Sequence, residues 1–172
     1  MIDLKPFIRD IPDFPKKGII FKDITPLLRE PKAMEQALRQ LCEPFEGRGV
    51  ELVAAIESRG FMFGALAAMR LGAGFVPIRK PGKLPYKTIS QSYDLEYGSN
   101  TIEIHCDAVG QGQKVLLIDD LLATGGTMAA ACGLVGKLGG RIVGVSFVIE
   151  LGFLNGRRLL EGQDVRSLIR YD

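Results

Sequence analysis

Short, almost purely apolar stretches alternate along the chain with longer segments of a different pattern. The apolar stretches predict strands at Glu51–Ile56, Phe75–Ile78, Val115–Ile118 and Ile142–Ile149, and a short final strand is predicted at Ser167–Arg170. The segments between them, with helical spacing of apolar residues or a high content of Ala and Met, predict helices at Pro31–Phe45, Phe61–Leu71 and Met128–Leu138. Strands without polar interruption that alternate with helices are typical of a mostly parallel central sheet flanked by helices. The sequence therefore predicts an α/β fold.

Two segments depart from this alternation. Residues 1–30 are interrupted by prolines and predict a short helix followed by an irregular arm. The segment from Arg79 to Asn100 contains prolines, glycines, hydroxyl residues and basic side chains, and it is too long for a simple connection in a compact domain. We therefore expect a long, flexible functional loop over about residues 80–100. Polar and apolar residues alternate in Thr101–Cys106, which predicts a further strand.

The composition narrows the possible functions. The 172 residues contain no repeat, low-complexity segment or linker, so we expect a single domain. The net charge of +2 is too small for a protein that coats nucleic acid, and the single histidine, His105, excludes a multi-histidine zinc site. The three cysteines show no CxxC spacing and are expected to be reduced thiols of a cytoplasmic protein. The charged N-terminus does not resemble a signal peptide and no apolar run reaches transmembrane length, so we expect neither a membrane nor a nucleic-acid partner.

The most informative segment runs from Val115 to Thr127 and reads VLLIDDLLATGGT. Asp119 and Asp120 follow apolar strand residues, at the end of the strand where open α/β sheets bind their ligands. The residues 123–127 then form a turn into a helix. Its two glycines allow successive backbone N–H groups to point at an anion, and the positive end of the helix adds to the attraction. The segment therefore predicts a phosphate cradle beside two carboxylates.

Two carboxylates next to a phosphate can bind Mg²⁺ or accept hydrogen bonds from ribose hydroxyls, so we expect a phosphorylated sugar as the ligand. The alternative is a plain connection between strand and helix, with the aspartates as caps and the glycines as turn formers. The adjacent acids and threonines favour the functional interpretation. The segment has neither the Gly-Lys-Ser/Thr of a Walker loop nor the G-x-G-x-x-G of a dinucleotide site.

This segment resembles the phosphoribosyl-pyrophosphate motif of type I phosphoribosyltransferases. The resemblance implies that one set of loop residues holds the 5′-phosphate: Ala123, Thr124, Gly125, Gly126 and Thr127. It also implies that Asp119 and Asp120 contact the ribose 2′ and 3′ hydroxyls. The implied architecture is the type I phosphoribosyltransferase fold, with a small N-terminal hood over about residues 1–30 and a flexible catalytic loop.

Further segments are similar to the adenine phosphoribosyltransferases within that family. They follow the family order and are Ile11–Ile24, Glu57–Phe61, Ile78–Pro85 and Ser92–Gly98. The resemblance covers almost the whole chain. It implies a pentosyltransferase of purine salvage, which transfers the 5-phosphoribosyl group from phosphoribosyl pyrophosphate to adenine and forms AMP and pyrophosphate. It further implies a homodimer and the cofactor Mg²⁺, held mainly by the substrate and not by dedicated protein ligands.

Ser58 and Arg59 follow a predicted strand, so they lie at the carboxyl edge of the sheet, where a turn can bind pyrophosphate. The resemblance assigns them this role, assisted by Arg79, Lys80 and Lys83. Each basic residue alone would be interpreted as part of a solvated surface. Their joint placement beside strand ends favours the binding role.

In the N-terminal arm, the resemblance implies that Phe21 stacks on adenine while backbone groups of Ile20 and Lys22 read the edge of the base. Lys22 stands where the family often has arginine; lysine keeps the charge but loses the planar fork. Leu151 would form an apolar wall on the other side of the base. The alternative is that the apolar residues of the arm belong to the core, and we prefer that interpretation for Ile19.

Glu96 lies in the long loop, and the resemblance implies that it is the acid–base residue near the purine imidazole. The alternative is an exposed loop carboxylate, the usual place of Glu. One rival function is a phosphoribosyltransferase for another base. The sequences of the hood and of the long loop argue against it. Another is a non-catalytic sensor of phosphoribosyl pyrophosphate that controls transcription, which would need a basic recognition helix. A third, a plain nucleotide-binding module, leaves the paired acids unexplained.

Overall fold

The structure, a computed structural model, describes residues 2–94 and 99–172. The chain forms two compact units, Met1–Gln40 and Leu41–Asp172. Among the described residues, no helix has both the length and the apolar character needed to cross a membrane. The single-domain assignment made from the sequence stays a prediction.

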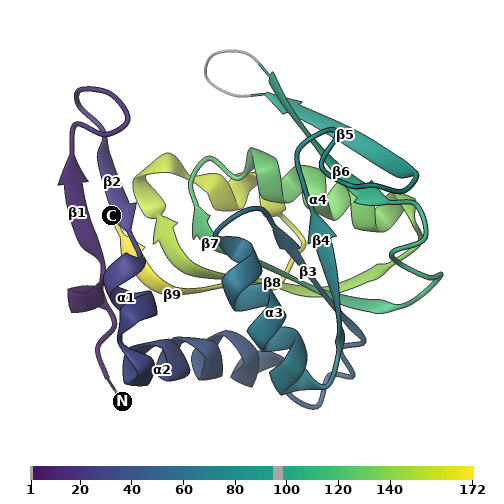
Figure 1. Cartoon of the computed structure of the whole chain (residues 1–172), viewed down its shortest axis with the longest axis horizontal. Coiled ribbons are helices and arrows are strands. Elements are labelled where there is room, and N and C mark those ends of the chain that lie inside the picture. The colour runs from purple at the N-terminus through teal and green to yellow at the C-terminus, as the bar shows by residue number, and fades with distance from the viewer. Residues whose placement is uncertain (1, 95–98) are drawn as a thin grey trace. The chain divides into compact units, whose positions relative to one another are not determined.

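The first unit is built around a β-hairpin. Its elements are η1 (Lys5–Phe7), β1 (Arg9–Pro12), β2 (Ile20–Asp23), α1 (Thr25–Arg29) and most of α2 (Pro31–Cys42). β1 and β2 pair in antiparallel fashion, with Ile11 opposite Phe21 (Figure 1). The prediction of an irregular arm is therefore wrong for this stretch.

The connection between β1 and β2 explains how a hairpin forms in such a proline-rich segment. Asp13 and Gly18 both have positive φ, 58° and 88°, so the chain can reverse there. The Asp13 carboxylate accepts a hydrogen bond of 2.7 Å from the Gly18 N–H. The ring of Phe14 packs edge-on against Phe21 with centroids 5.2 Å apart. These contacts join residues on both sides of the turn, and a local hydrophobic pattern cannot reveal them.

The second unit contains a central sheet of five strands in the order β4-β3-β7-β8-β9. The strands are β3 (Leu52–Ile56), β4 (Gly74–Ile78), β7 (Lys114–Leu122), β8 (Arg141–Leu151) and β9 (Val165–Tyr171). All neighbouring pairs are parallel, so the predicted parallel sheet is confirmed. The strand order runs in one direction from β3 to β4 and in the other from β7 to β9. The order therefore reverses between β3 and β7, and such a switch point opens a crevice for ligands at the carboxyl ends of the strands.

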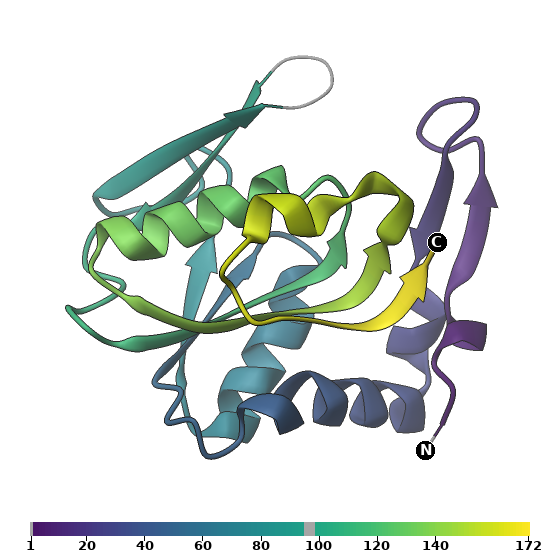
Figure 2. The same ribbon diagram turned by 180° about the vertical axis from the view of Figure 1, so that it is seen from behind.

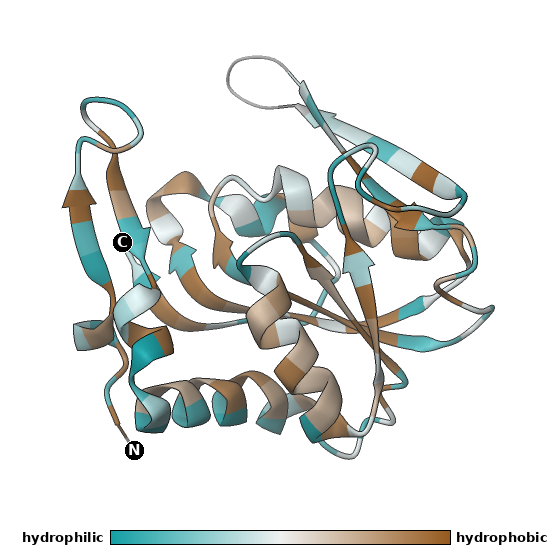
Figure 3. Cartoon of the chain, in the orientation of Figure 1, coloured by the Kyte–Doolittle hydropathy of each residue, from teal (hydrophilic) through white to brown (hydrophobic). Residues whose placement is uncertain are grey.

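Two helices cover opposite faces of this sheet: α3 (Gly60–Leu71) and α4 (Gly126–Lys137) (Figures 1 and 2). Successive side chains of β3 alternate between them. Gly64 of α3 lies so close to Ala55 that a Cβ on the glycine would overlap the Ala55 side chain. Ala54 and Ile56 instead belong to the buried cluster that contains Leu134 of α4. Because β3 is buried on both faces, it is apolar along its whole length (Figure 3).

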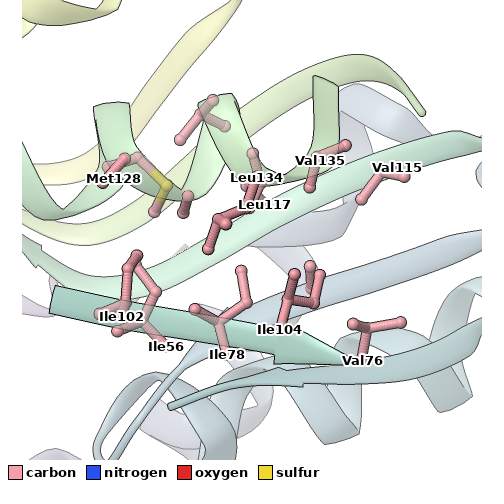
Figure 4. Close-up of a cluster of buried hydrophobic side chains, with 14 of the residues drawn as sticks. Ile56, Val76, Ile78, Ile102, Ile104, Val115, Leu117, Met128, Leu134 and Val135 are labelled. Atoms are coloured by element: carbon pink, nitrogen blue, oxygen red, sulfur yellow. The ribbon is translucent and has the colours of Figure 1, made fainter. Parts of the chain in front are cut away.

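A second hairpin, formed by β5 (Thr88–Asp94) and β6 (Ser99–His105), lies against α4. Ile102 and Ile104 of β6 enter the cluster between α4 and the sheet, as Figure 4 shows. Ile89 of β5 packs against the same cluster. The sequence predicted the strand near Thr101 but expected a loop in place of β5. That expectation is wrong because antiparallel pairing with β6 satisfies the backbone of a strand whose own residues are mostly polar.

Element boundaries differ from the predictions in ways that matter for the site. β7 continues to Leu122, so Asp119 and Asp120 lie within the strand near its carboxyl end. α2 ends at Cys42 and is followed by η2 (Glu43–Phe45). Two short helical turns, η3 (Gly152–Leu154) and η4 (Gly156–Leu160), fill the connection between β8 and β9, where no element was predicted.

Candidate active site

A cleft of about 290 Å³ opens at the switch point, where β3 and β7 end. Its lining combines polar residues from the end of β3, from β7 and from the β5–β6 hairpin. The lining residues are Ile56, Glu57, Ser58, Arg59, Lys80, Tyr93, Asn100, Thr101, Ile102, Asp119, Asp120 and Thr127. Three carboxylates and two basic side chains thus face one space at the position where α/β folds bind ligands.

The turn between β7 and α4 encloses a smaller hollow of about 70 Å³. The residues that line it are Asp119, Leu121, Leu122, Ala123, Thr124, Gly125, Thr127, Met128 and Phe147. Asp119 and Thr127 line both spaces, so the hollow adjoins the cleft. The hollow lies at the N-terminus of a helix of 12 residues, where unpaired backbone N–H groups attract anions.

Two glycines bring the turn into contact with the segment that follows β8. Gly125 has a φ of 87°, and a Cβ there would collide with the carbonyl oxygen of Gly156. A Cβ on Gly156 would in turn collide with the carbonyl oxygen of Ala123. The two backbones therefore touch directly, and only glycine fits at either position. Ala123 and Gly125, which Gly156 approaches, both line the small hollow.

The two aspartates of β7 differ in their surroundings. Burial first, and repulsion by Asp120 second, raise the pKa of Asp119 well above its usual range. Burial also raises the pKa of Asp120, against the opposing effect of Arg59, whose Nε lies 2.9 Å from Asp120 Oδ2. This buried oxygen accepts no hydrogen bond from any residue that the structure describes. A buried acceptor beside a cleft is suited to a ligand hydroxyl, which would supply the missing hydrogen bond.

Glu57 organises the other side of the cleft. Its carboxylate accepts hydrogen bonds from Arg79 Nε at 2.8 Å and from the Lys80 N–H at 2.7 Å. Burial by itself would raise the pKa of Glu57, but these two hydrogen bonds and the charge of Arg79 outweigh it and lower the pKa. An ionised Glu57 therefore ties the end of β4 to the turn that carries Ser58 and Arg59. The Glu57–Ser58 peptide bond is cis.

Sequence comparisons agree with this geometry. Residues 23–159 match the family described as phosphoribosyl transferase domain. The adenine phosphoribosyltransferase of Thermotoga maritima is 57% identical over 170 residues, which cover 99% of this chain and 98% of that protein. The protein of the same name from Methylococcus capsulatus is 57% identical over 171 residues, with coverage of 99% and 100%. The chain belongs to the adenine phosphoribosyltransferase family.

Solved structures of the adenine phosphoribosyltransferases have the same fold. The protein from Thermoanaerobacter pseudethanolicus is 56% identical and superimposes with a TM-score of 0.95, covering 98% of each chain. The protein from Saccharomyces cerevisiae, complexed with an imino-altritol bisphosphate and adenine, is 40% identical with a TM-score of 0.90 over 96% of each chain. The predicted type I phosphoribosyltransferase fold is confirmed.

The structure brings most of the predicted phosphoribosyl pyrophosphate residues together. Ser58, Arg59 and Lys80 line the cleft with both aspartates, as a pyrophosphate site would require. Arg79 does not line it, because its guanidinium binds Glu57 and the Lys83 carbonyl oxygen. Lys83 itself is exposed outside the lining. The pyrophosphate roles of these residues stay predictions.

The predicted adenine-binding residues belong to different units of the chain. Ile20 and Phe21 lie on β2 of the first unit, with Ile20 55% exposed and Phe21 partly buried. The side chain of Lys22 is buried and its Nζ donates a hydrogen bond of 2.6 Å to Asp10. Ile19 is 38% exposed, so its predicted place in the core is wrong. Leu151 ends β8 in the second unit and is half-buried.

The predicted acid–base residue, Glu96, lies outside the described residues. Among the described residues on either side of it, Tyr93 and Asn100 pair across the hairpin and both line the cleft. Asn100 and Thr101 were not predicted as site residues. Both residues lie on β6, which pairs with β5, and the structure shows that they line the cleft.

Metal binding was tested on the donors that the cleft offers. In the described parts of the chain, no cluster of three or more His, Cys, Asp or Glu side chains could hold a metal ion. Asp119 and Asp120 nevertheless present carboxylate oxygens, the ligands that Mg²⁺ prefers, to the same cleft as Ser58 and Arg59. These residues fit a Mg²⁺ ion that completes its coordination with substrate oxygens.

Proposed function

We propose that this chain transfers the 5-phosphoribosyl group from phosphoribosyl pyrophosphate to adenine, forming AMP and pyrophosphate in purine salvage. The observation that carries this proposal is the junction of a glycine cradle with a cleft that holds a partly buried and a buried aspartate, Asp119 and Asp120, and a basic turn. These features supply a place for each part of the donor: phosphate, ribose and pyrophosphate. The names of the relatives at 57% identity support adenine as the acceptor.

In this proposal the backbone of Ala123–Thr127 holds the 5′-phosphate, with the hydroxyls of Thr124 and Thr127 as further donors. The first turn of α4 adds unpaired N–H groups and a positive dipole end. Asp119 and Asp120 accept hydrogen bonds from the ribose 2′ and 3′ hydroxyls. The Oδ2 of Asp120 supports this role, since this buried oxygen forms an ion pair with Arg59 and accepts no hydrogen bond from the described residues, so that it retains acceptor capacity for a ribose hydroxyl.

Ser58, Arg59 and Lys80 hold the pyrophosphate, and Glu57 positions them by binding the Lys80 N–H. Mg²⁺, when bound with the substrate, neutralises charge on the leaving pyrophosphate. The bond between the anomeric carbon and pyrophosphate breaks as positive charge develops on the ribose ring, and the adjacent carboxylates stabilise that charge. Arg79 keeps Glu57 ionised and in place and contributes to the site through it.

The adenine contacts proposed in the first unit are the ring of Phe21 and the backbone groups of Ile20 and Lys22. In the second unit, Leu151 is proposed as an apolar contact of the base. Phe21 supports this as a partly buried aromatic ring that is held edge-on by another ring, Phe14. Glu96 accepts the proton that adenine loses as the new bond forms. Its support is the position of its sequence neighbours Tyr93 and Asn100 in the lining of the cleft.

The decisive experiment measures AMP formation by the purified protein with phosphoribosyl pyrophosphate, Mg²⁺ and each of adenine, hypoxanthine, guanine and xanthine. We expect turnover with adenine to exceed that with the other bases. The matched variant Asp120→Asn should retain the fold but bind phosphoribosyl pyrophosphate more weakly, because the amide removes one acceptor. Faster turnover with another base would show that this base, and not adenine, is the acceptor of the phosphoribosyl group. The absence of any product would refute the proposal.

We also infer that the protein is a cytoplasmic homodimer. The three free cysteines support a reducing compartment. For the dimer, the support is an exposed apolar surface on α3 and β4, which consists of Met62, Leu66, Met69 and Phe75. Met69 is 81% exposed and each of the others at least 37%. Clustered apolar side chains of this kind mark interaction surfaces.

A further inference from the structure

A buried ion-pair network lies behind the glycine cradle. Its centre is Glu150 near the end of β8, which is only 3% exposed. The Glu150 carboxylate accepts two hydrogen bonds from Arg157, at 2.8 and 2.7 Å. It accepts further hydrogen bonds from Ser167 and Arg170. Every bond to this carboxylate comes from the connection after β8 or from β9.

Arg157 fastens the connection to both strands. Besides the two bonds to Glu150, its guanidinium donates to the Val165 carbonyl oxygen at 2.9 Å and to Ser167 Oγ at 3.0 Å. Only the planar guanidinium of arginine can donate these several hydrogen bonds at once, and the single ammonium group of lysine cannot reproduce them. Arg157 therefore links η4 to the end of β8 and to the start of β9.

The residue before Arg157 is the one that touches the cradle. Gly156 lies so close to Ala123 and Gly125 that neither glycine tolerates a Cβ. The backbone of η4 thus forms a rigid support behind the turn between β7 and α4. A displacement of Arg157 moves this support, because Gly156 and Arg157 share a peptide bond.

We propose that Glu150 and Arg157 are positioning residues for the 5′-phosphate site, because their ion pair holds Gly156 against the glycine cradle and so sets its geometry. The proposal rests on the proposed function, in which this cradle binds the 5′-phosphate. The residues touch no substrate and act only through the backbone of Gly156. We expect their effect to be specific to the phosphate end of the donor, because the pyrophosphate turn at Ser58 and Arg59 follows β3 and not β7.

The test compares Arg157→Lys with a matched control, Arg166→Lys. Arg166 lies on β9 and forms an ion pair at 2.7 Å with Asp164, but its side chain is 51% exposed and its partner is Asp164 instead of Glu150. Each variant is titrated by calorimetry with ribose 5-phosphate and, separately, with pyrophosphate. For Arg157→Lys we expect the dissociation constant of ribose 5-phosphate to rise about tenfold, the equivalent of one charge-assisted hydrogen bond. Pyrophosphate affinity should stay within about twofold, and Arg166→Lys should change neither value.

Glu150→Gln serves as a second variant, because it keeps the shape of the side chain while removing its charge. Thermal unfolding accompanies each titration, so that a global loss of structure is recognised. Equal weakening of both ligands, or unchanged ribose 5-phosphate affinity in both variants, would overturn the inference. Both of these outcomes leave the proposed function intact as long as the wild-type protein forms AMP. Failure of the wild-type protein to form AMP would instead refute the proposed function on which the inference rests.

Discussion

The substitution Gly125→Ala tests the cradle with the smallest possible change. Gly125 has a φ of 87° and begins α4 as its N-cap residue. An added Cβ would overlap the Gly156 carbonyl oxygen, and it would lie 3.1 Å from the Gly156 carbonyl carbon. The neighbour is backbone and not the end of a flexible side chain, so the overlap can be relieved only by moving the turn or η4.

The magnitude follows from two separate costs. A residue with a Cβ in the left-handed region loses about 1–2 kcal/mol relative to glycine. Forcing an extra methyl group into a packed site costs about 1–3 kcal/mol more. Gly162→Ala is the matched control, since Gly162 has a φ of 84° but no atom within 4 Å of an added Cβ. The free energy of unfolding should therefore fall in both variants, but by about 1–3 kcal/mol more for Gly125→Ala.

Urea unfolding measures this difference, and calorimetry with ribose 5-phosphate measures the effect on the site. We expect Gly125→Ala to weaken ribose 5-phosphate binding by about 10- to 100-fold, because displacement of the phosphate donors by less than 1 Å has effects of that size. Gly162→Ala should bind as the wild type does. Equal destabilisation of the two variants, together with unchanged ligand affinity, would refute the steric argument and the position of the cradle.

Further substitutions test other parts of the proposal. Gly125→Val, which adds a β-branched side chain, should abolish detectable binding of ribose 5-phosphate by calorimetry. Glu96→Ala should lower the turnover number in the AMP assay by about 10²–10⁴-fold. If the variant folds and loses less than about tenfold, Glu96 positions the substrate and is not the general base. Because the pKa of Glu57 is lowered in the folded state, its stabilising effect is present above its usual pKa of 4.5 and is lost as the pH falls through the lowered value. Glu57→Gln should therefore flatten the acid limb of stability below about pH 4.5 and weaken pyrophosphate binding; an unchanged acid limb would contradict the shift. Leu66→Glu should convert the proposed dimer to a monomer in sedimentation velocity. If the wild-type protein itself sediments as a monomer, the proposed interface is wrong.

The features predicted from the sequence are those whose residues are neighbours in the chain. The strand β7, the turn and the helix α4 follow one another directly, so apolar content, paired glycines and turn chemistry were sufficient to indicate a phosphate cradle. The parallel sheet was predictable for a related reason. A strand buried on both faces, such as β3, must be apolar throughout.

The features that the sequence left undetermined depend on partners far along the chain. β5 was expected to be a loop because its polar residues become a strand only through pairing with β6. Arg79 was assigned to pyrophosphate from the family resemblance and its place beside a strand end, whereas only the structure shows that Glu57, 22 positions away in the sequence, binds its guanidinium. No local pattern shows which of two nearby basic residues, Arg79 or Lys80, faces the cleft.

The chain by itself therefore determined the family, the class of fold and the chemistry of the cradle, since these depend on contiguous residues with characteristic backbone preferences. Only the tertiary structure decided that Gly156 supports Gly125 and that Glu150 and Arg157 stand behind both. The physical reason is that close packing of two backbones is a contact between distant segments. Its requirement for glycine can be recognised only when both segments are seen together.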